Sequence, residues 1–192
     1  AEYYSSKKYA IKYADIVTHS YHPVKAFTTG EGGSVISKNK KISKKIELMR
    51  NHSMIKSKKF DPWIYKIQDA GMNYRITDIQ CALGLSQLNK LNKFIKSRRQ
   101  IAKIYLSKLE ECENFINPIE KKNCKHSYHL YPLQILFDKI KINKKELFYF
   151  FRRKGILLQV HYIPIHLQPF YAKNFNINRK LLTNSENFYK RE

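Results

Sequence analysis

The chain has 192 residues, 43% hydrophobic and 14% aromatic, which suffices for a folded core in one large domain or two modest ones. Its longest apolar run, Leu147–Phe151, has five residues, whereas a membrane-spanning helix needs roughly 20, so we expect no membrane partner. The net charge of +22 raises the question of nucleic-acid binding, but 29 of the 37 basic residues are Lys and they are scattered along the chain. Lysine reads phosphate and guanine less specifically than arginine does, so we expect no nucleic-acid partner.

The cysteines restrict the chemistry further. Cys81, Cys112 and Cys124 are odd in number and widely spaced, which excludes a disulfide framework and any CxxC motif, so we expect no metal site. This usage fits a reducing cytosol, and no secretory signal is visible at the start of the chain; both features predict a cytoplasmic protein. The sequence also begins without Met, which we interpret as a fragment or a processed chain.

The first part of the chain alternates helix and strand signals. Residues 4–12 predict a short helix, and the β-branched run Asp15–His19 predicts a buried strand. A glycine-rich turn, Thr29–Gly33, precedes a second short strand at Ser34–Ser37. Residues 40–50 predict a helix, because their apolar residues fall on one face.

A long helical pattern follows. Thr77-Asp78-Ile79-Gln80 is a capping box, which marks a helix start. The pattern predicts one helix over about 77–110, or two helices that meet near Asn89–Asn92. A helix of this length is typical of one that leaves one domain and enters another. We therefore expect two domains, residues 1–90 and residues 91–192.

The remaining elements predict a small α+β domain. Asn143 and Glu146 form a second capping pair, and the helix that they open should close at Gly155. The runs Leu130–Phe137 and Ile156–Tyr162 predict strands on either side of this helix.

The densest chemical signal is the string Ser20-Tyr21-His22-Pro23-Val24-Lys25 with the glycine-rich turn after it. A lysine held in a partly desolvated pocket near other cations loses its proton more easily, and its neutral amine attacks aldehydes. A surface lysine beside a tight turn is the ordinary alternative, and the residues alone favour it, because a Gly-x-Gly-Gly turn is a weak signal.

Several stretches resemble the pyridoxal-phosphate-dependent sugar-nucleotide aminotransferases of the DegT type (fold type I). They are SYHPVKAFTTGEGGSVIS, GMNYRITDIQCALGLSQL, SYHLYPLQI, KGILLQVHYIPIHLQPFY and the closing NSENFYKRE, in the family's order. The resemblance implies an α/β chain that holds the rear part of the large domain and most of the small α+β C-terminal domain. Within the family, the sequence of these stretches is most similar to that of the transaminases that aminate C4 of a UDP-linked 4-keto-6-deoxy-N-acetyl sugar for pseudaminic acid synthesis.

The resemblance also implies residue roles. Lys25 matches the lysine that binds pyridoxal 5′-phosphate covalently and then moves the proton between the amino donor and the cofactor. Dehydratase relatives carry His at this position, so Lys25 favours transamination. Ser20 matches the hydroxyl that binds the cofactor phosphate. Asn73 matches an amide that reaches the phosphate in the neighbouring subunit, which implies a homodimer.

For four other residues the resemblance leaves two roles open. His22 either shapes the cofactor pocket or is a structural histidine. Arg75 either binds a substrate or donor carboxylate or pairs with Asp78. His161 and Tyr162 match the loop that lines the sugar-nucleotide pocket, although both could be core residues at a strand end.

The expected function is transfer of an amino group, from L-glutamate by analogy, to a nucleotide-linked 4-keto-6-deoxy sugar. In relatives, the carboxylate that bonds the pyridine nitrogen and the residue that stacks on the ring lie before the stretch that matches the first residues here, and the relatives also continue beyond Glu192. We therefore expect a fragment cut at both ends that is inactive alone. A non-catalytic remnant of such an enzyme and a basic nucleic-acid-binding module are the alternatives.

Overall fold

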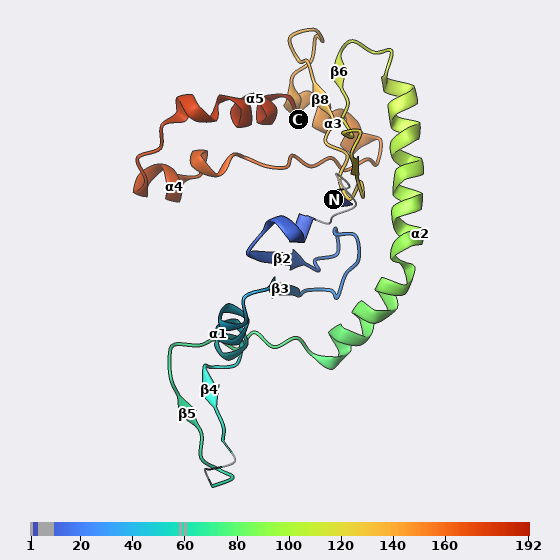
Figure 1. Cartoon of the computed structure of the whole chain (residues 1–192). Coiled ribbons are helices and arrows are strands. Elements are labelled where there is room, and N and C mark those ends of the chain that lie inside the picture. The colour runs from blue at the N-terminus through green and yellow to red at the C-terminus, as the bar shows by residue number, and fades with distance from the viewer. Residues whose placement is uncertain (1, 4–9, 58, 60) are drawn as a thin grey trace. The chain divides into compact units, whose positions relative to one another are not determined.

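The computed structural model describes residues 2–3, 10–57, 59 and 61–192 (Figure 1). The chain forms two compact units. The first unit comprises Ala1–Arg99 and Glu120–His129, and the second comprises Gln100–Ile119 and Leu130–Glu192. The helix α2 (Asp78–Leu109) contains the first of the three points at which the chain passes between the units, after Arg99, and also the boundary expected at residues 90 and 91.

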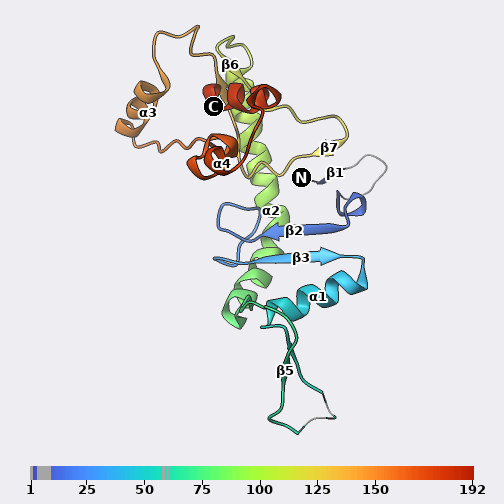
Figure 2. The ribbon, with the colours of Figure 1, turned by 90° about the vertical axis from the view of Figure 1, so that its left-hand side faces the viewer.

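A β-hairpin carries the candidate lysine. Strands β2 (Ile16–Ser20) and β3 (Gly33–Ser37) pair antiparallel, with Ser20 opposite Gly33 (Figure 2), which confirms that both predicted strands form. The expectation that the first strand is buried was wrong, because four of the five residues of β2 are exposed. A β-carbon on Gly33 would lie 2.6 Å from the His19 carbonyl oxygen. Residues 21–32, which join the two strands and carry Lys25, are called the lysine loop below. Only glycine fits at position 33, where this loop ends and β3 begins.

The helix predicted over residues 4–12 falls mostly on residues 4–9, which lie outside the described part of the chain. Within the described part, Ala10–Tyr13 form the 3₁₀ helix η2. Strand β1 (Glu2–Tyr3) pairs with β7 (Cys124–Lys125), which belongs to the same unit although it is far away in sequence.

Helix α1 (Lys40–Arg50) follows the hairpin and confirms the predicted helix. The Asn39 side chain caps it by accepting hydrogen bonds from the amides of Lys41 (2.9 Å) and Ile42 (3.3 Å). Strands β4 (Met54–Ile55) and β5 (Lys66–Ile67) then pair antiparallel and lie side by side below α1 in Figure 1.

Helix α2 runs without interruption from Asp78 to Leu109, so the single-helix alternative was the right one. The predicted capping box is present. The Gln80 amide donates to Thr77 Oγ1 at 3.3 Å, and the Thr77 amide donates to Gln80 Oε1 at 2.9 Å. Two small residues, Gly84 and Ala102, are buried on this helix.

In the second unit, β6 (Phe115–Ile116) pairs antiparallel with β8 (Gln134–Ile135). Helix α3 (Lys144–Arg153) opens with the predicted Asn143–Glu146 capping box, and Gly155 follows its end with a left-handed φ of 76°. The remaining elements are η3 (Ile165–Leu167), α4 (Pro169–Asn174), η4 (Arg179–Leu182) and α5 (Thr183–Arg191).

The two strands predicted in this unit need correction. Of Leu130–Phe137 only Gln134–Ile135 pairs, and no strand forms over Ile156–Tyr162 within the described chain. The Ile156 amide instead donates to the Phe151 carbonyl at 3.0 Å and closes α3. An apolar run indicates that its residues suit a sheet, but a strand also needs a partner backbone, which this segment lacks among the described residues.

Among the described helices, none is both long enough and apolar enough to cross a membrane.

Candidate active site

Lys25 lies on the loop between β2 and β3, and the backbone on both sides of it is fixed. Its amide donates to the His22 carbonyl at 2.9 Å, and its own carbonyl accepts a hydrogen bond from Arg98 Nη2 at 3.1 Å. The residue is half-buried. Lys25 Nζ makes no hydrogen bond or ion pair with other described residues, so the amine remains available for chemistry.

The loop closes on itself through main-chain hydrogen bonds. The Tyr21 amide donates to the Gly32 carbonyl at 2.9 Å, and the Thr29 amide donates to the Tyr21 carbonyl at 3.1 Å. Thr29 is buried, and the φ values of Gly30 (80°) and Gly32 (149°) are ones that other residues rarely adopt. The glycine-rich turn therefore gives the loop a defined shape.

Helix α2 packs against this loop. Gln80 Nε2 donates to the Glu31 carbonyl at 3.0 Å, and Arg98 Nη1 donates to the Ala26 carbonyl at 3.2 Å. Between these two contacts, a β-carbon on Gly84 would lie 2.8 Å from Thr29 Cγ2. The missing side chain at Gly84 thus allows the helix and the turn to approach closely.

Ser20 ends β2, and its hydroxyl oxygen accepts a 3.4 Å hydrogen bond from the His22 amide. This leaves the hydroxyl proton free to be donated. The His22 ring accepts from the Val24 amide at 3.4 Å, and its Nε2 lies 3.8 Å from Glu31 Oε1. His22 therefore has local structural contacts and is exposed rather than buried.

Asn73 and Arg75 both contact Asn51. Asn73 forms an isolated antiparallel bridge with it, and Arg75 Nη1 donates to its Oδ1 at 3.0 Å. No ion pair joins Arg75 to Asp78 among the described residues. Both side chains are exposed.

His161 and Tyr162 lie in the second unit, whereas Lys25 lies in the first. The His161 amide donates to Glu192 Oε2 at 2.9 Å, and the same carboxylate lies 3.7 Å from His161 Nδ1. The Glu192 side chain is 5% exposed, while Tyr162 is 70% exposed. His161 is thus held by a buried carboxylate, and Tyr162 offers a free aromatic surface.

A cluster around Arg99 was not predicted from the sequence. This arginine forms a two-pronged ion pair with Glu120 (2.6 and 3.0 Å) and also donates to the His126 carbonyl at 2.8 Å. The hydrogen bonds from Arg99 lower the pKa of Glu120. A usable signal was present, because Arg98 and Arg99 are adjacent arginines in a chain whose cations are mostly lysines.

His129 is a second missed residue. It is half-buried, and its pKa is lowered by burial and then by the nearby positive charges of Lys25, His126 and Arg98. The His129 imidazole is therefore neutral near pH 7, and it lies within the electrostatic field of Lys25.

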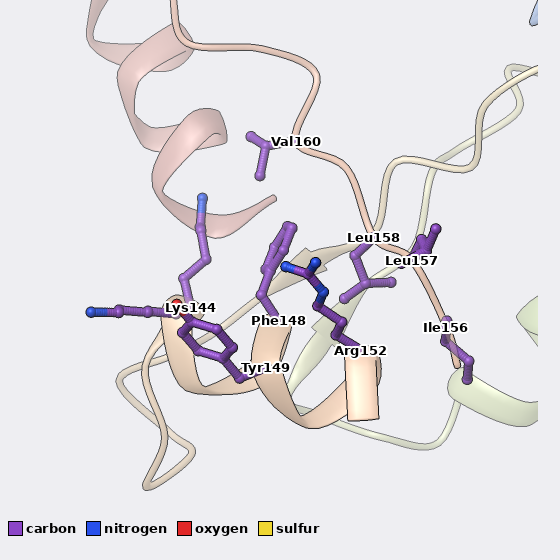
Figure 3. A pocket seen from close by; sticks show the side chains of 9 residues that line it. Lys144, Phe148, Tyr149, Arg152, Ile156, Leu157, Leu158 and Val160 are labelled. Atoms are coloured by element: carbon purple, nitrogen blue, oxygen red, sulfur yellow. The ribbon is translucent and has the colours of Figure 1, made fainter. Parts of the chain in front are cut away.

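A separate hollow of about 490 Å³ lies in the second unit between α3 and residues 156–160. Figure 3 shows Phe148 extending from α3 toward Val160. Lys144, at the edge of the hollow, is already bonded to the Tyr189 carbonyl and lies over the Tyr189 ring. The hollow contains none of the predicted site residues. Across the described residues, no group of three or more His, Cys, Asp or Glu is arranged to hold a metal ion.

The residues around Lys25 fit the expected cofactor. Pyridoxal phosphate needs an amine for its aldehyde and hydrogen-bond donors for its phosphate. Lys25 Nζ has no competing partner among the described residues, and Ser20, at the end of β2 just before the loop of Lys25, retains a hydroxyl proton. Both groups are attached to one hairpin that is fixed at its base and along its loop.

Comparisons with known proteins cover nearly the whole chain. The sequence model of the DegT/DnrJ/EryC1/StrS aminotransferase family matches residues 2–192. The UDP-4-amino-4,6-dideoxy-N-acetyl-beta-L-altrosamine transaminase of Campylobacter jejuni serotype O:2 is 40% identical over 189 residues, which cover 98% of this chain and 48% of that protein. The spore coat polysaccharide biosynthesis protein SpsC of Bacillus subtilis is 30% identical over 183 residues, 92% of this chain and 47% of its own.

Solved structures of aminotransferases also match this chain. Helicobacter pylori PseC, an aminotransferase involved in the biosynthesis of pseudoaminic acid, matches with a TM-score of 0.84 and 33% identity over 98% of this chain and 49% of its own. The PLP-form of Streptococcus pneumoniae Spr1654 matches in fold, with a TM-score of 0.82 at 24% identity. These matches confirm the expected fold class, part of the type I fold of PLP-dependent transferases. The chain spans about half the length of the curated relatives it matches.

Proposed function

Because the chain belongs to the DegT/DnrJ/EryC1/StrS aminotransferase family, we propose that it contributes the lysine half of a PLP-dependent aminotransferase site. The observation that carries this proposal is Lys25, whose backbone is fixed on both sides while its amine is unpaired among the described residues. Ser20 supports it, because a hydroxyl at the end of β2, where the loop of Lys25 begins, suits a phosphate group.

When bound, pyridoxal phosphate supplies an electron-poor ring that accepts the electrons released at Cα of the amino donor. Lys25 Nζ would hold the cofactor through its aldehyde, and it would serve as the general base that takes the proton from Cα of the donor. The same amine then returns the proton as a general acid. Ser20 Oγ would donate a hydrogen bond to the cofactor phosphate, because its hydroxyl proton is not used by the contact with the His22 amide.

The acceptor in this proposal is a nucleotide-linked 4-keto-6-deoxy sugar and the donor is L-glutamate. The name of the 40% identical Campylobacter jejuni transaminase supports a UDP-linked 4,6-dideoxy sugar. His161 and Tyr162 are the proposed sugar-nucleotide contacts, because the buried Glu192 carboxylate orients the histidine and the Tyr162 ring is exposed. Arg75 is a candidate for a substrate or donor carboxylate, since its exposed guanidinium faces only a neutral amide in the described chain.

The proposed assembly is a homodimer in which Asn73 reaches the phosphate of the neighbouring site. The exposed Asn73 side chain supports this role, since its bridge to Asn51 is between backbones. An Asn73→Ala substitution that leaves both cofactor affinity and dimerisation unchanged would contradict this part of the proposal.

The central test is Lys25→Ala in the protein at its natural full length. We expect loss of the visible absorbance of the lysine-bound cofactor and a fall in turnover of a 4-keto sugar nucleotide by at least about 10²-fold, the usual size of a general acid–base contribution. Lys41→Ala, on the exposed face of α1, is the matched control and should leave both unchanged. Retained absorbance and turnover in Lys25→Ala would refute the assignment.

A further inference from the structure

We infer that Arg98 is a positioning residue for Lys25. Its guanidinium donates hydrogen bonds to two consecutive carbonyls of the lysine loop and so fixes the position of the backbone that carries Lys25 Nζ. Arg98 Nη2 donates to the Lys25 carbonyl at 3.1 Å, and Nη1 donates to the Ala26 carbonyl at 3.2 Å. The inference rests on the proposed function, since it assigns the support of the same reactive amine.

The placement of Arg98 along α2 strengthens this inference. Arg98 follows Gln80 by 18 positions in sequence, which is about five turns of 3.6 residues, so the two side chains leave the same face of the helix. Gln80 binds the carbonyl of Glu31, at the far end of the loop. Gly84 lies on nearly the same face and contacts the turn at Thr29. One helix face therefore holds the loop at its lysine, at its turn and at its return.

The type of residue matters as well. A guanidinium presents several N–H groups in a rigid plane, so it can bind two neighbouring oxygens at once. An ammonium group has the same charge but no fixed fork, so lysine at this position would hold one carbonyl or neither well. The contact also involves a charged donor, which makes its hydrogen bonds stronger than those between neutral groups.

The next residue extends the support to a second segment. Arg99 holds Glu120 and the His126 carbonyl, and so anchors residues 120–129 in the same unit as the lysine loop. This segment ends with His129, which lies in the electrostatic field of Lys25 and Arg98. Two adjacent arginines thus bind both the loop that carries Lys25 and the segment from Glu120 to His129.

The test compares Arg98→Met with Lys96→Met, an exposed position on the same helix, in the full-length protein. Hydrogen exchange should become at least about tenfold faster in Arg98→Met at the amides of Lys25 and Thr29, because two charge-assisted hydrogen bonds are lost. Exchange within α1 should be unchanged. Lys96→Met should match the wild type at both places.

A chemical measurement on the same proteins follows the amine itself. Pyridoxal phosphate is added to the cofactor-free proteins, the adduct is reduced with borohydride, and its rate of formation at Lys25 is read by mass spectrometry. We expect a rate at least about tenfold lower in Arg98→Met, with kcat lowered and the KM for the amino donor nearly unchanged. A wild-type rate, together with wild-type loop exchange, would overturn the inference.

Two further outcomes also decide between the proposals: a variant that does not fold, and a wild type that is not labelled at Lys25. If Arg98→Met does not fold, Arg98→Lys takes its place: faster exchange in the loop with normal exchange in α1 supports the inference, and wild-type behaviour of both refutes it. If pyridoxal phosphate does not label Lys25 of the wild type in preference to other lysines, the proposed function fails. The comparison of loop exchange still decides whether Arg98 positions the loop.

Discussion

Gly84 is an interior helix residue at which alanine should destabilise the protein. It is buried in α2, and a β-carbon added there would lie 2.8 Å from Thr29 Cγ2. Ordinary carbon–carbon contacts are about 3.5–4.0 Å, so the added methyl overlaps the threonine methyl. Thr29 cannot easily turn away, because it is 4% exposed and its Oγ1 donates to the Glu31 carbonyl at 2.6 Å.

Two opposing effects set the magnitude. Alanine is favoured over glycine in a helix interior by about 1 kcal/mol, whereas overpacking of a tight contact costs about 1–3 kcal/mol. The clash prevails in the wild-type background, and we expect Gly84→Ala to lower the free energy of unfolding by about 0–2 kcal/mol. The sign of this change in the free energy of unfolding is informative, because replacing glycine by alanine at an exposed position of a helix usually stabilises a protein.

A double-mutant cycle isolates the contact. Thr29→Ser removes the Cγ2 methyl while keeping the hydroxyl that binds the Glu31 carbonyl, at a cost of about 0.8 kcal/mol for one buried methyl. In the Thr29→Ser background the overlap is gone, so Gly84→Ala should stabilise by up to about 1 kcal/mol. The coupling energy should therefore be about 1–3 kcal/mol, measured from urea midpoints followed by circular dichroism.

If Gly84→Ala stabilises the wild type as much as it stabilises the Thr29→Ser variant, the close contact between Gly84 and the Thr29 methyl is refuted. That result would mean that α2 and the turn are not packed as closely as the structure has them. The support that α2 gives to the lysine loop would then rest on its hydrogen bonds alone.

Two carboxylates should show their pKa shifts in acid. The hydrogen bonds from Arg179 and then His166 lower the pKa of Glu186 to about 2, so its stabilising effect is complete above about pH 4.3 and is lost as the pH falls toward 2. A carbon NMR titration should place the Glu186 midpoint near 2, and in Arg179→Met it should move toward the ordinary value. Glu120 also has a lowered pKa, caused first by the hydrogen bonds from Arg99. Its contribution to the free energy of unfolding is therefore complete above its unfolded pKa and is lost as the pH falls. In urea unfolding, Glu120→Gln should be less stable than the wild type at pH 7, and this difference in stability should shrink on acidification. An unchanged difference down to pH 3 would contradict the ion pair.

Local signals predicted the elements that are stabilised locally. The capping boxes at Thr77 and Asn143 marked helix starts correctly, because a cap depends on residues within one turn of the chain. The β2–β3 hairpin was predictable for the same reason, since its two strands are joined through a short loop rich in glycine. The turn that carries Lys25 was predictable because it lies within this local unit, whereas the role of Lys25 is implied by the family resemblance and not by the local pattern.

Features that depend on distant residues were not predictable from single-sequence patterns. The run Ile156–Tyr162 has strand composition, but whether it pairs depends on backbone that no local pattern specifies. The same holds for Arg98, whose partners at Lys25 and Ala26 lie over 70 positions away in sequence. The adjacent arginines Arg98 and Arg99 stand out among the lysines of the chain, but no local pattern specifies which carbonyls or carboxylates they bind.

The ten residues from Glu120 to His129 have a consequence for the modularity of the protein. They belong to the first unit although the segments on both sides of them belong to the second, so the chain passes between the units three times. They supply β7 to pair with β1 and Glu120 to pair with Arg99. A single cut can therefore not separate the two units intact, and recombination between related genes would have to exchange non-contiguous pieces to transfer the lysine-bearing unit. Divergence within such a chain is expected to proceed by substitution inside both units rather than by exchange of whole domains.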